Sequence, residues 1–378
     1  MRNWMQWSHL AGLVGVIGLA LAGGACKGNG SGGSSTASSG GAGGGAPSSG
    51  DVSLNGSGAS FPNPLYSKWI AEYQAIEKNT KINYQSIGSG AGIKAISDRT
   101  VDFGASDAPM SDDQLAKAGG KLLHIPMTLG AVVVTYNVPG APDHLNLTPE
   151  VLSAIFLHDV TMWNDAKIAS LNPTAKLPAQ TIGVVYRSDG SGTTSVFTDY
   201  LAKVSPVWKD KVGTGTSVKW PTGTGANKND GVANQVKSTP GAIGYVELAF
   251  ALQTKQPVAM LKNHAGKFVE PSLDAITSAA AGAATKMPED LRISIVDAEG
   301  DASYPISAFT YVLVYDEMSD AAKGQALASF LWWGLHDGQK MAPALHYAPL
   351  PAEVVSKAEA RVKLMKAAGK PLLAGAGK

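Results

Sequence analysis

Three short loops rich in glycine and serine are the part of this sequence best suited to chemistry. They read Gly-Ser-Gly-Ala-Ser over 56–60, Gly-Ser-Gly-Ala-Gly over 88–92 and Arg-Ser-Asp-Gly-Ser-Gly-Thr-Thr over 187–194. Each loop follows a strand-like run and precedes a helix-like one, so hydroxyls and bare N–H groups stand at a helix start. Helix starts carry unpaired N–H donors and a positive dipole end, and glycine lets the backbone approach an oxyanion closely. The pattern therefore predicts an anion-binding site.

Any one of these loops also fits an ordinary helix cap or turn. Three of them favour a site, because loops that follow the strands of an open α/β sheet gather at one edge. Arg187 adds a charged donor to the third loop, and Asp189 can hold its guanidinium in place. The alternative for Arg187 is an exposed surface side chain.

Asp107 adds an acid that follows the strand-like run 101–105. One interpretation is that it caps the next helix. The other is that it accepts a hydrogen bond within the anion site, where it would repel a fully deprotonated anion. Phosphate carries one or two protons at neutral pH and sulfate carries none, so Asp107 would then select phosphate.

The sequence lacks the motifs of several enzyme classes. It contains no G-x-x-x-x-G-K-[ST], no G-x-S-x-G and no H-E-x-x-H. The seven histidines are scattered outside the three loops, and one such as His124 or His158 is more typical of a structural role. Donors without a nucleophile or general base indicate binding rather than turnover. We expect no catalytic residue, no metal and no cofactor.

Composition excludes further classes. The 31 basic and 30 acidic residues give a net charge of +1 and no general attraction to nucleic acid. One cysteine excludes a disulfide framework and a cluster of thiolate metal ligands. At 378 residues, the chain favours more than one core, or one core built in two lobes.

The first 26 residues have the layout of a signal peptide, with Arg2, an uncharged run over 10–25 and then Cys26. The cysteine stands where a bacterial lipoprotein would be cut and lipidated. Ordinary export with cleavage after Ala22 is the alternative, and a membrane-spanning helix is disfavoured because the apolar stretch is short. Residues 27–50 are almost entirely Gly, Ser and Ala, which predicts a flexible tether.

The region from residue 51 onward alternates strand and helix patterns, which predicts an α/β fold with covered sheets. Strand-like runs cover 51–55, 81–87, 101–105, 122–125, 131–136, 182–186, 242–246 and 309–314. Helix-like runs cover 65–76, 93–97, 111–118 and 193–201, and another begins at 148–150.

Six stretches together resemble one protein family: G-S-G-A-S-F-P, I-G-S-G-A-G, V-D-F-G-A-S-D-A-P, D-G-S-G-T-T, V-G-T-G-T-S-V-K-W-P and P-G-A-I-G-Y-V-E. They are similar to the phosphate-binding proteins of bacterial high-affinity phosphate ABC transporters. The resemblance implies a two-lobed, type II periplasmic-binding-protein fold with two hinge crossings, near Pro126 and near Pro305. It implies a first lobe of residues 51–126 plus 307–378 and a second lobe of residues 127–306.

The resemblance also implies a ligand set and a role. The implied phosphate ligands are Ser60, Phe61, Ser89, Asp107, Arg187, Ser191, Gly192 and Thr193, with Asp189 supporting Arg187. The expected function is an exported, monomeric, non-enzymatic receptor that delivers phosphate to the permease and ATPase subunits of an ABC transporter. It would reside in the periplasm or cell envelope, anchored only if Cys26 is lipidated. A secreted phosphatase is the alternative.

Overall fold

The computed structural model describes residues 50–373 of the chain. The predicted signal peptide, Cys26 and all of the predicted tether except Gly50 lie outside the described residues. In the part that is described, no helix has the length and apolar character needed to cross a membrane.

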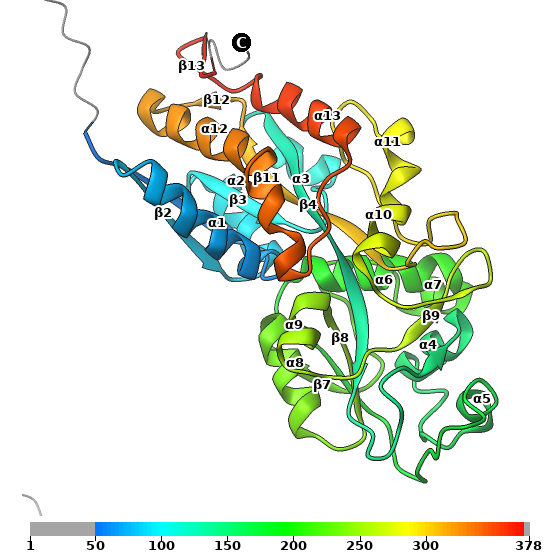
Figure 1. Cartoon of the computed structure of the whole chain (residues 1–378). Helices are drawn as coiled ribbons and strands as arrows, with labels where there is room; N and C mark the ends of the chain where they lie inside the picture. The colour runs from blue at the N-terminus through cyan, green and yellow to red at the C-terminus, as the bar shows by residue number, and fades with distance from the viewer. Residues whose placement is uncertain (1–49, 374–378) are drawn as a thin grey trace, which may run out of the picture. The chain divides into compact units, whose positions relative to one another are not determined.

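A mixed eight-stranded sheet forms the centre of this region (Figure 1). Its strands, in spatial order, are β2 (Thr80–Ser86), β1 (Val52–Gly58), β3 (Phe103–Ser106), β11 (Ser307–Tyr315), β4 (Leu122–Tyr136), β8 (Ala242–Glu247), β6 (Gly183–Arg187) and β7 (Thr224–Ala226). The strands β2, β1 and β3 are mutually parallel, as are β8, β6 and β7. The two central strands, β11 and β4, are antiparallel to each of their neighbours. The predicted α/β character is confirmed.

The long strand β4 joins the two groups of parallel strands. Its residues 122–131 pair with β11, and its residues 132–136 pair with β8. The sequence predicted two separate runs here, 122–125 and 131–136, whereas the strand is continuous and buried throughout. The register shifts beside Pro126, so that Met127 is an extra residue whose carbonyl accepts a 2.8 Å hydrogen bond from Gln339. This irregularity accommodates the missing proline N–H.

Helices cover both groups of strands, as the alternating pattern predicted (Figure 1). They are α1 (Asn63–Ile76), α2 (Ser89–Ser97), α3 (Asp112–Lys117), α4 (Pro149–Phe156), α5 (Ala166–Ala169), α6 (Gly192–Val204), α7 (Pro206–Lys211), α8 (Lys228–Ser238), α9 (Leu248–Gln253), α10 (Leu273–Ala281), α11 (Ala283–Lys286), α12 (Ala321–Leu335) and α13 (Ala352–Val362). Two small sheets complete the fold, with strands β5 (Asn146–Leu147), β9 (Met260–Lys262), β10 (Phe268–Val269), β12 (Glu317–Met318), β13 (Lys366–Ala367) and β14 (Lys370–Pro371).

Local capping explains where several helices begin. The Ser111 side chain accepts a hydrogen bond from the Gln114 backbone N–H, and the Gln114 side-chain oxygen accepts one from the Ser111 backbone N–H, which is a complete capping box. The Thr148 side chain caps α4, ahead of Pro149, by accepting a hydrogen bond from the Val151 backbone N–H. These two predicted helix starts are confirmed.

The segment between α11 and β11 is bonded to elements of both strand groups. The Arg292 guanidinium donates to the Met110 carbonyl at 2.8 Å, next to α3. Two residues later, Ser294 donates to Asp199 of α6 at 2.6 Å. The predicted lobe boundaries at residues 126 and 306 stay a prediction.

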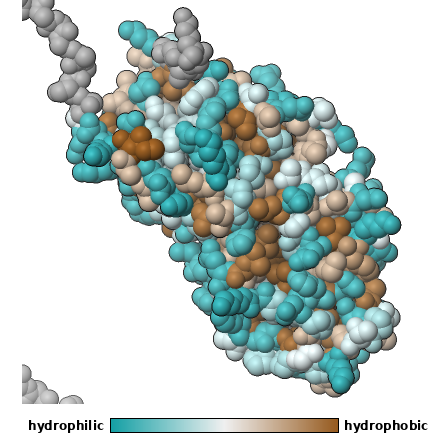
Figure 2. All heavy atoms as spheres, in the orientation of Figure 1, coloured by the Kyte–Doolittle hydropathy of each residue, from teal (hydrophilic) through white to brown (hydrophobic). Residues whose placement is uncertain are grey.

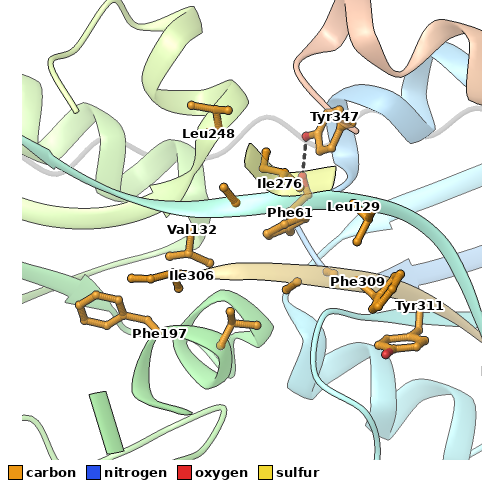
Figure 3. Packing of buried hydrophobic residues seen from close by; sticks show 14 of the residues in the cluster. Phe61, Leu129, Val132, Phe197, Leu248, Ile276, Ile306, Phe309, Tyr311 and Tyr347 are labelled. Carbon is orange, nitrogen blue, oxygen red and sulfur yellow. Dashed lines mark hydrogen bonds between the residues drawn. The ribbon is translucent and has the colours of Figure 1, made fainter. Parts of the chain in front are cut away.

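The surface view of Figure 2 shows a face that is largely hydrophilic, with apolar side chains in scattered patches. Among residues 50–373, the large apolar residues that are exposed are Ile76, Ile87, Val207, Leu252 and Leu364, which come from separate parts of the chain. The apolar residues of β4 and β11, in contrast, are buried, and Figure 3 shows them packed where these strands lie side by side.

Candidate anion-binding site

The three predicted loops meet in space. The Gly90 N–H, in the second loop, donates to the Gly190 carbonyl of the third loop at 2.8 Å. Gly192 lies so close to the second loop that an added Cβ would stand 2.5 Å from Ser89 Oγ and 2.6 Å from Asp107 Oδ2. Only glycine allows this approach, because real Cβ contacts do not come so near.

The predicted ligand side chains are enclosed rather than exposed at the loop tips. Ser60, Ser89, Asp107 and Arg187 have exposed fractions of 2%, 1%, 3% and 4%. Phe61, Ser191, Gly192 and Thr193 are buried as well. Buried polar groups need hydrogen-bond partners, so the bonds within this cluster determine what it can bind.

Arg187 is held by Asp189, as the sequence predicted. Arg187 Nε lies 2.8 Å from Asp189 Oδ1, and Nη2 lies 2.5 Å from Oδ2. Burial raises the pKa of Asp189, but the hydrogen bonds and charge of Arg187 outweigh it and leave that pKa below its ordinary value. Nη1 donates to Thr193 Oγ1 at 3.3 Å. A guanidinium has five N–H donors, so two of them stay free for a ligand.

Asp107 is a buried carboxyl between the two strand groups. Thr310 Oγ1, on β11, donates to its Oδ1 at 2.9 Å, and Ser89 Oγ lies 3.4 Å from its Oδ2. Burial raises the pKa of Asp107 to about 7, although Thr310, Arg187 and Ser89 each lower it. The helix-cap interpretation of Asp107 is wrong, because Ser111 caps the helix that follows.

Two residues near the site escaped the sequence analysis. Thr310 comes from a strand far along the chain, and nothing local marks it. Asn229 is in the first turn of α8, where its Nδ2 lies 3.0 Å from Ser60 Oγ and 3.2 Å from Thr193 Oγ1. The run Gly-Thr-Gly-Ala-Asn over 223–227, a fourth glycine-rich stretch ahead of a helix, is the signal that could have found it.

Phe61 is positioned through its backbone. Its carbonyl accepts a 2.6 Å hydrogen bond from the Tyr347 hydroxyl (Figure 3). That hydroxyl also lies 3.1 Å from Oε2 of Glu247, at the end of β8. Burial raises the pKa of Glu247 well above its ordinary range, which favours the neutral form of this carboxyl. Tyr347 thereby joins the first loop to the end of β8.

Asp107 also lines a cavity of about 90 Å³. Its lining includes Pro109, Asp199, Ser294 and Phe309, but Asp107 is the only predicted ligand among the lining residues that the structure describes. Over residues 50–373, no three His, Cys, Asp or Glu side chains are grouped as a metal site. His124 is engaged structurally, since its Nε2 accepts a 3.0 Å hydrogen bond from the Met110 N–H.

Comparison with known proteins adds a family to this geometry. The family model described as "PBP superfamily domain" matches residues 34–333. A phosphate-binding protein PstS of Xylella fastidiosa is 47% identical over 310 residues, which cover 82% of this chain and 84% of the relative. The PstS of Pasteurella multocida is 44% identical over 312 residues, covering 82% and 90%. The chain belongs to the PstS family of phosphate-binding proteins.

Solved structures agree on the fold. A high-affinity periplasmic phosphate-binding protein bound with phosphate superposes with a TM-score of 0.66 at 22% identity, covering 82% of this chain and 93% of that one. A phosphate-binding protein from Stenotrophomonas maltophilia gives a TM-score of 0.63 at 20% identity, covering 82% and 93%. The predicted type II periplasmic-binding-protein fold is confirmed.

Proposed function

We propose that this protein is the phosphate-capturing receptor of an ABC transporter and that it binds inorganic phosphate without turning it over. The observation that carries the proposal is the buried cluster in which hydroxyls, backbone N–H groups and one guanidinium surround a single protonatable carboxyl. The proposed ligands are Ser60, Phe61, Ser89, Asp107, Arg187, Ser191, Gly192 and Thr193, with Asp189 orienting Arg187.

The donors of the cluster suit a tetrahedral oxyanion. Ser191 and Gly192 stand at the start of α6, where unpaired N–H groups and the helix dipole favour negative charge. Arg187 contributes its two free N–H donors and one full charge. Charge-assisted hydrogen bonds are shorter and stronger than neutral ones, which offsets the removal of water from the anion.

Asp107 is the proposed basis of selectivity. Bound phosphate can donate its own proton to the ionised carboxylate, whereas sulfate would face an unpaired carboxylate in an enclosed site. A buried acceptor without a partner costs about 1–3 kcal/mol, and more when it is charged. Because the pKa of Asp107 is about 7, the carboxyl gains a proton in mildly acidic solution and could then donate to sulfate. Sulfate rejection should therefore weaken as the pH falls.

Binding rather than catalysis is favoured by the same residues. His124 is buried and its Nε2 already accepts a hydrogen bond from the Met110 N–H, so this nitrogen does not face the site as a general base. The relatives are named as binding proteins, and nothing favours the phosphatase alternative.

The partners and location follow as part of the proposal. We infer that a permease and an ATPase subunit receive the phosphate, and that the chain acts as a monomer outside the cytoplasmic membrane. Residues 127–306 would close as one lobe against the rest of the folded region. Lipidation of Cys26 would tether the protein to the membrane, and Cys26→Ser would then move it into the soluble exported fraction.

The deciding experiment is a calorimetric titration of the purified protein with phosphate, arsenate and sulfate at about pH 8 and about pH 6. We expect tight binding of phosphate and arsenate at both, and detectable sulfate competition only at the lower pH. In the Asp107→Asn variant, sulfate should compete with phosphate equally at both pH values. The exposed Asp210→Asn is the matched control and should behave as the wild type. No heat with phosphate would reject the proposed function.

A further inference from the structure

Asn229 is bonded to two of the proposed ligand hydroxyls and is not itself among the proposed ligands. It lies in the first turn of α8 with an exposed fraction of 0%. Its backbone N–H donates to Ser60 Oγ at 3.3 Å, and its Nδ2 donates to Ser60 Oγ at 3.0 Å and to Thr193 Oγ1 at 3.2 Å. One side chain thus contacts both the first and the third loop.

The orientation of the Asn229 amide is fixed by a bond on its other side. The Glu247 backbone N–H donates to Asn229 Oδ1 at 3.0 Å. A backbone N–H can only donate, so the atom facing it must be the amide oxygen, and the NH₂ group must face the two hydroxyls. Both hydroxyl oxygens therefore act as acceptors toward Asn229.

Counting lone pairs shows what is left to each hydroxyl. A serine or threonine hydroxyl has two lone pairs and one proton. Ser60 Oγ receives two N–H bonds from Asn229, one from the backbone and one from the side chain. Thr193 Oγ1 receives one from Asn229 and one, at 3.3 Å, from Arg187 Nη1. With both lone pairs occupied, each hydroxyl can use only its proton.

From this arrangement we propose that Asn229 is a positioning residue that makes Ser60 and Thr193 obligate hydrogen-bond donors toward the bound anion. The inference rests on the proposed function, because it takes these two hydroxyls as phosphate ligands. A freely rotating hydroxyl would present a lone pair to the anion part of the time, and that orientation is repulsive. By filling the lone pairs in advance, Asn229 orders the site before the ligand arrives.

The test variant is Asn229→Leu, which keeps the approximate size of the side chain and introduces no charge. We expect phosphate affinity to fall by about 10- to 100-fold, because each hydroxyl loses one of its two N–H partners and regains a free lone pair. Asn172→Leu is the matched control: Asn172 is also buried, its Nδ2 donates to the Asn146 and Ile168 carbonyls at 3.0 Å, and its Oδ1 accepts from the Asn146 N–H. The control should lose stability and keep its affinity.

A double-mutant cycle separates positioning from a general structural effect. The Asn229→Leu change is repeated in a Ser60→Ala/Thr193→Val background, where there are no hydroxyls to orient. Positioning predicts that the further loss of affinity is then less than about threefold. An equal loss in both backgrounds, or unchanged affinity in the single variant, would overturn the inference.

A second variant covers the case in which Asn229→Leu does not fold. Asn229→Asp keeps the oxygen that accepts from Glu247 but replaces the donating NH₂ with a second acceptor, which would turn both hydroxyl protons away from the ligand. It should bind phosphate more weakly than Asn229→Leu, and wild-type affinity in Asn229→Asp would also overturn the inference. Failure of the proposed function is recognised separately, because the wild type itself would then not bind phosphate.

Discussion

Replacing Asp107 with asparagine should change how the stability of the phosphate-free protein depends on pH. Burial raises the pKa of Asp107 from 3.8 to about 7, against the lowering effects of Thr310, Arg187 and Ser89. In the unfolded chain the carboxyl returns to its ordinary pKa. Between about pH 4 and pH 7, the folded protein therefore holds a proton that the unfolded chain has released.

The sign and size of the effect follow from this difference. The contribution of Asp107 to stability is fully present below its unfolded pKa of 3.8 and is lost as the pH rises through about 7. The difference between a pKa of 3.8 and one of about 7, at about 1.36 kcal/mol per pH unit, amounts to about 4 kcal/mol. The side chain is 3% exposed, so solvent screens it little. Asp107→Asn carries no titrating group and should lack this decline.

Urea denaturation in phosphate-free buffer, repeated from about pH 4 to about pH 8, measures the effect. The informative quantity is the unfolding free energy of the wild type minus that of Asp107→Asn at each pH. Buried groups that do not interact with Asp107, such as His124, contribute equally in both proteins and cancel in this difference. Asp210→Asn, at an exposed position, provides the control difference and should give a level line.

A difference curve for Asp107→Asn that stays level within about 0.5 kcal/mol would refute the reasoning. It would mean that Asp107 is ionised throughout this pH range in the folded protein, with the charge of Arg187 outweighing burial. The proposed weakening of sulfate rejection in acid would then lose its physical basis.

Three further variants test the geometry. Arg187→Ala should weaken phosphate binding by about 10- to 150-fold, since a hydrogen bond to a charged group contributes about 1.5–3 kcal/mol. Titration calorimetry measures this affinity, and an unchanged value would remove Arg187 from the site. Gly192→Ala should abolish tight phosphate binding, because the added Cβ would stand 2.5 Å from Ser89 Oγ. Gly231→Ala, in helix α8, is the control and should bind phosphate as the wild type does, because its added Cβ would meet no atom nearer than 3.7 Å. Tyr347→Phe should lower the unfolding free energy by about 1–3 kcal/mol in urea titrations, since it leaves the Phe61 carbonyl without its donor.

Much of the fold was predictable because its signals are local. The capping box at Ser111 and the Thr148-Pro149 pair mark helix starts within a few residues of sequence. The glycine-serine loops have the same local character, and the order of the strands brings them together. The pairing of Arg187 with Asp189 could also be inferred, because the two residues are close neighbours in the chain.

What could not be predicted depends on contacts between distant segments. The continuity of β4 through Pro126 needs the extra residue Met127 and the Gln339 side chain, which lies more than 200 residues further on. Thr310 reaches Asp107 only because β11 is inserted between β3 and β4. The raised pKa of Asp107 is a consequence of burial, and burial is a property of the folded chain.

The donors and the acceptor of the site play different physical roles. Arg187 is fixed by Asp189, and the hydroxyls of Ser60 and Thr193 have their lone pairs filled, so these groups act only as donors. Asp107 is the group in the cluster that can exchange a proton near neutral pH. Under the proposed function, one proton shared between Asp107 and the anion would therefore govern both selectivity and the response to pH. That proton can come from the ligand or from the carboxyl, which explains why phosphate should bind over a wide pH range while sulfate depends on the protonation of Asp107.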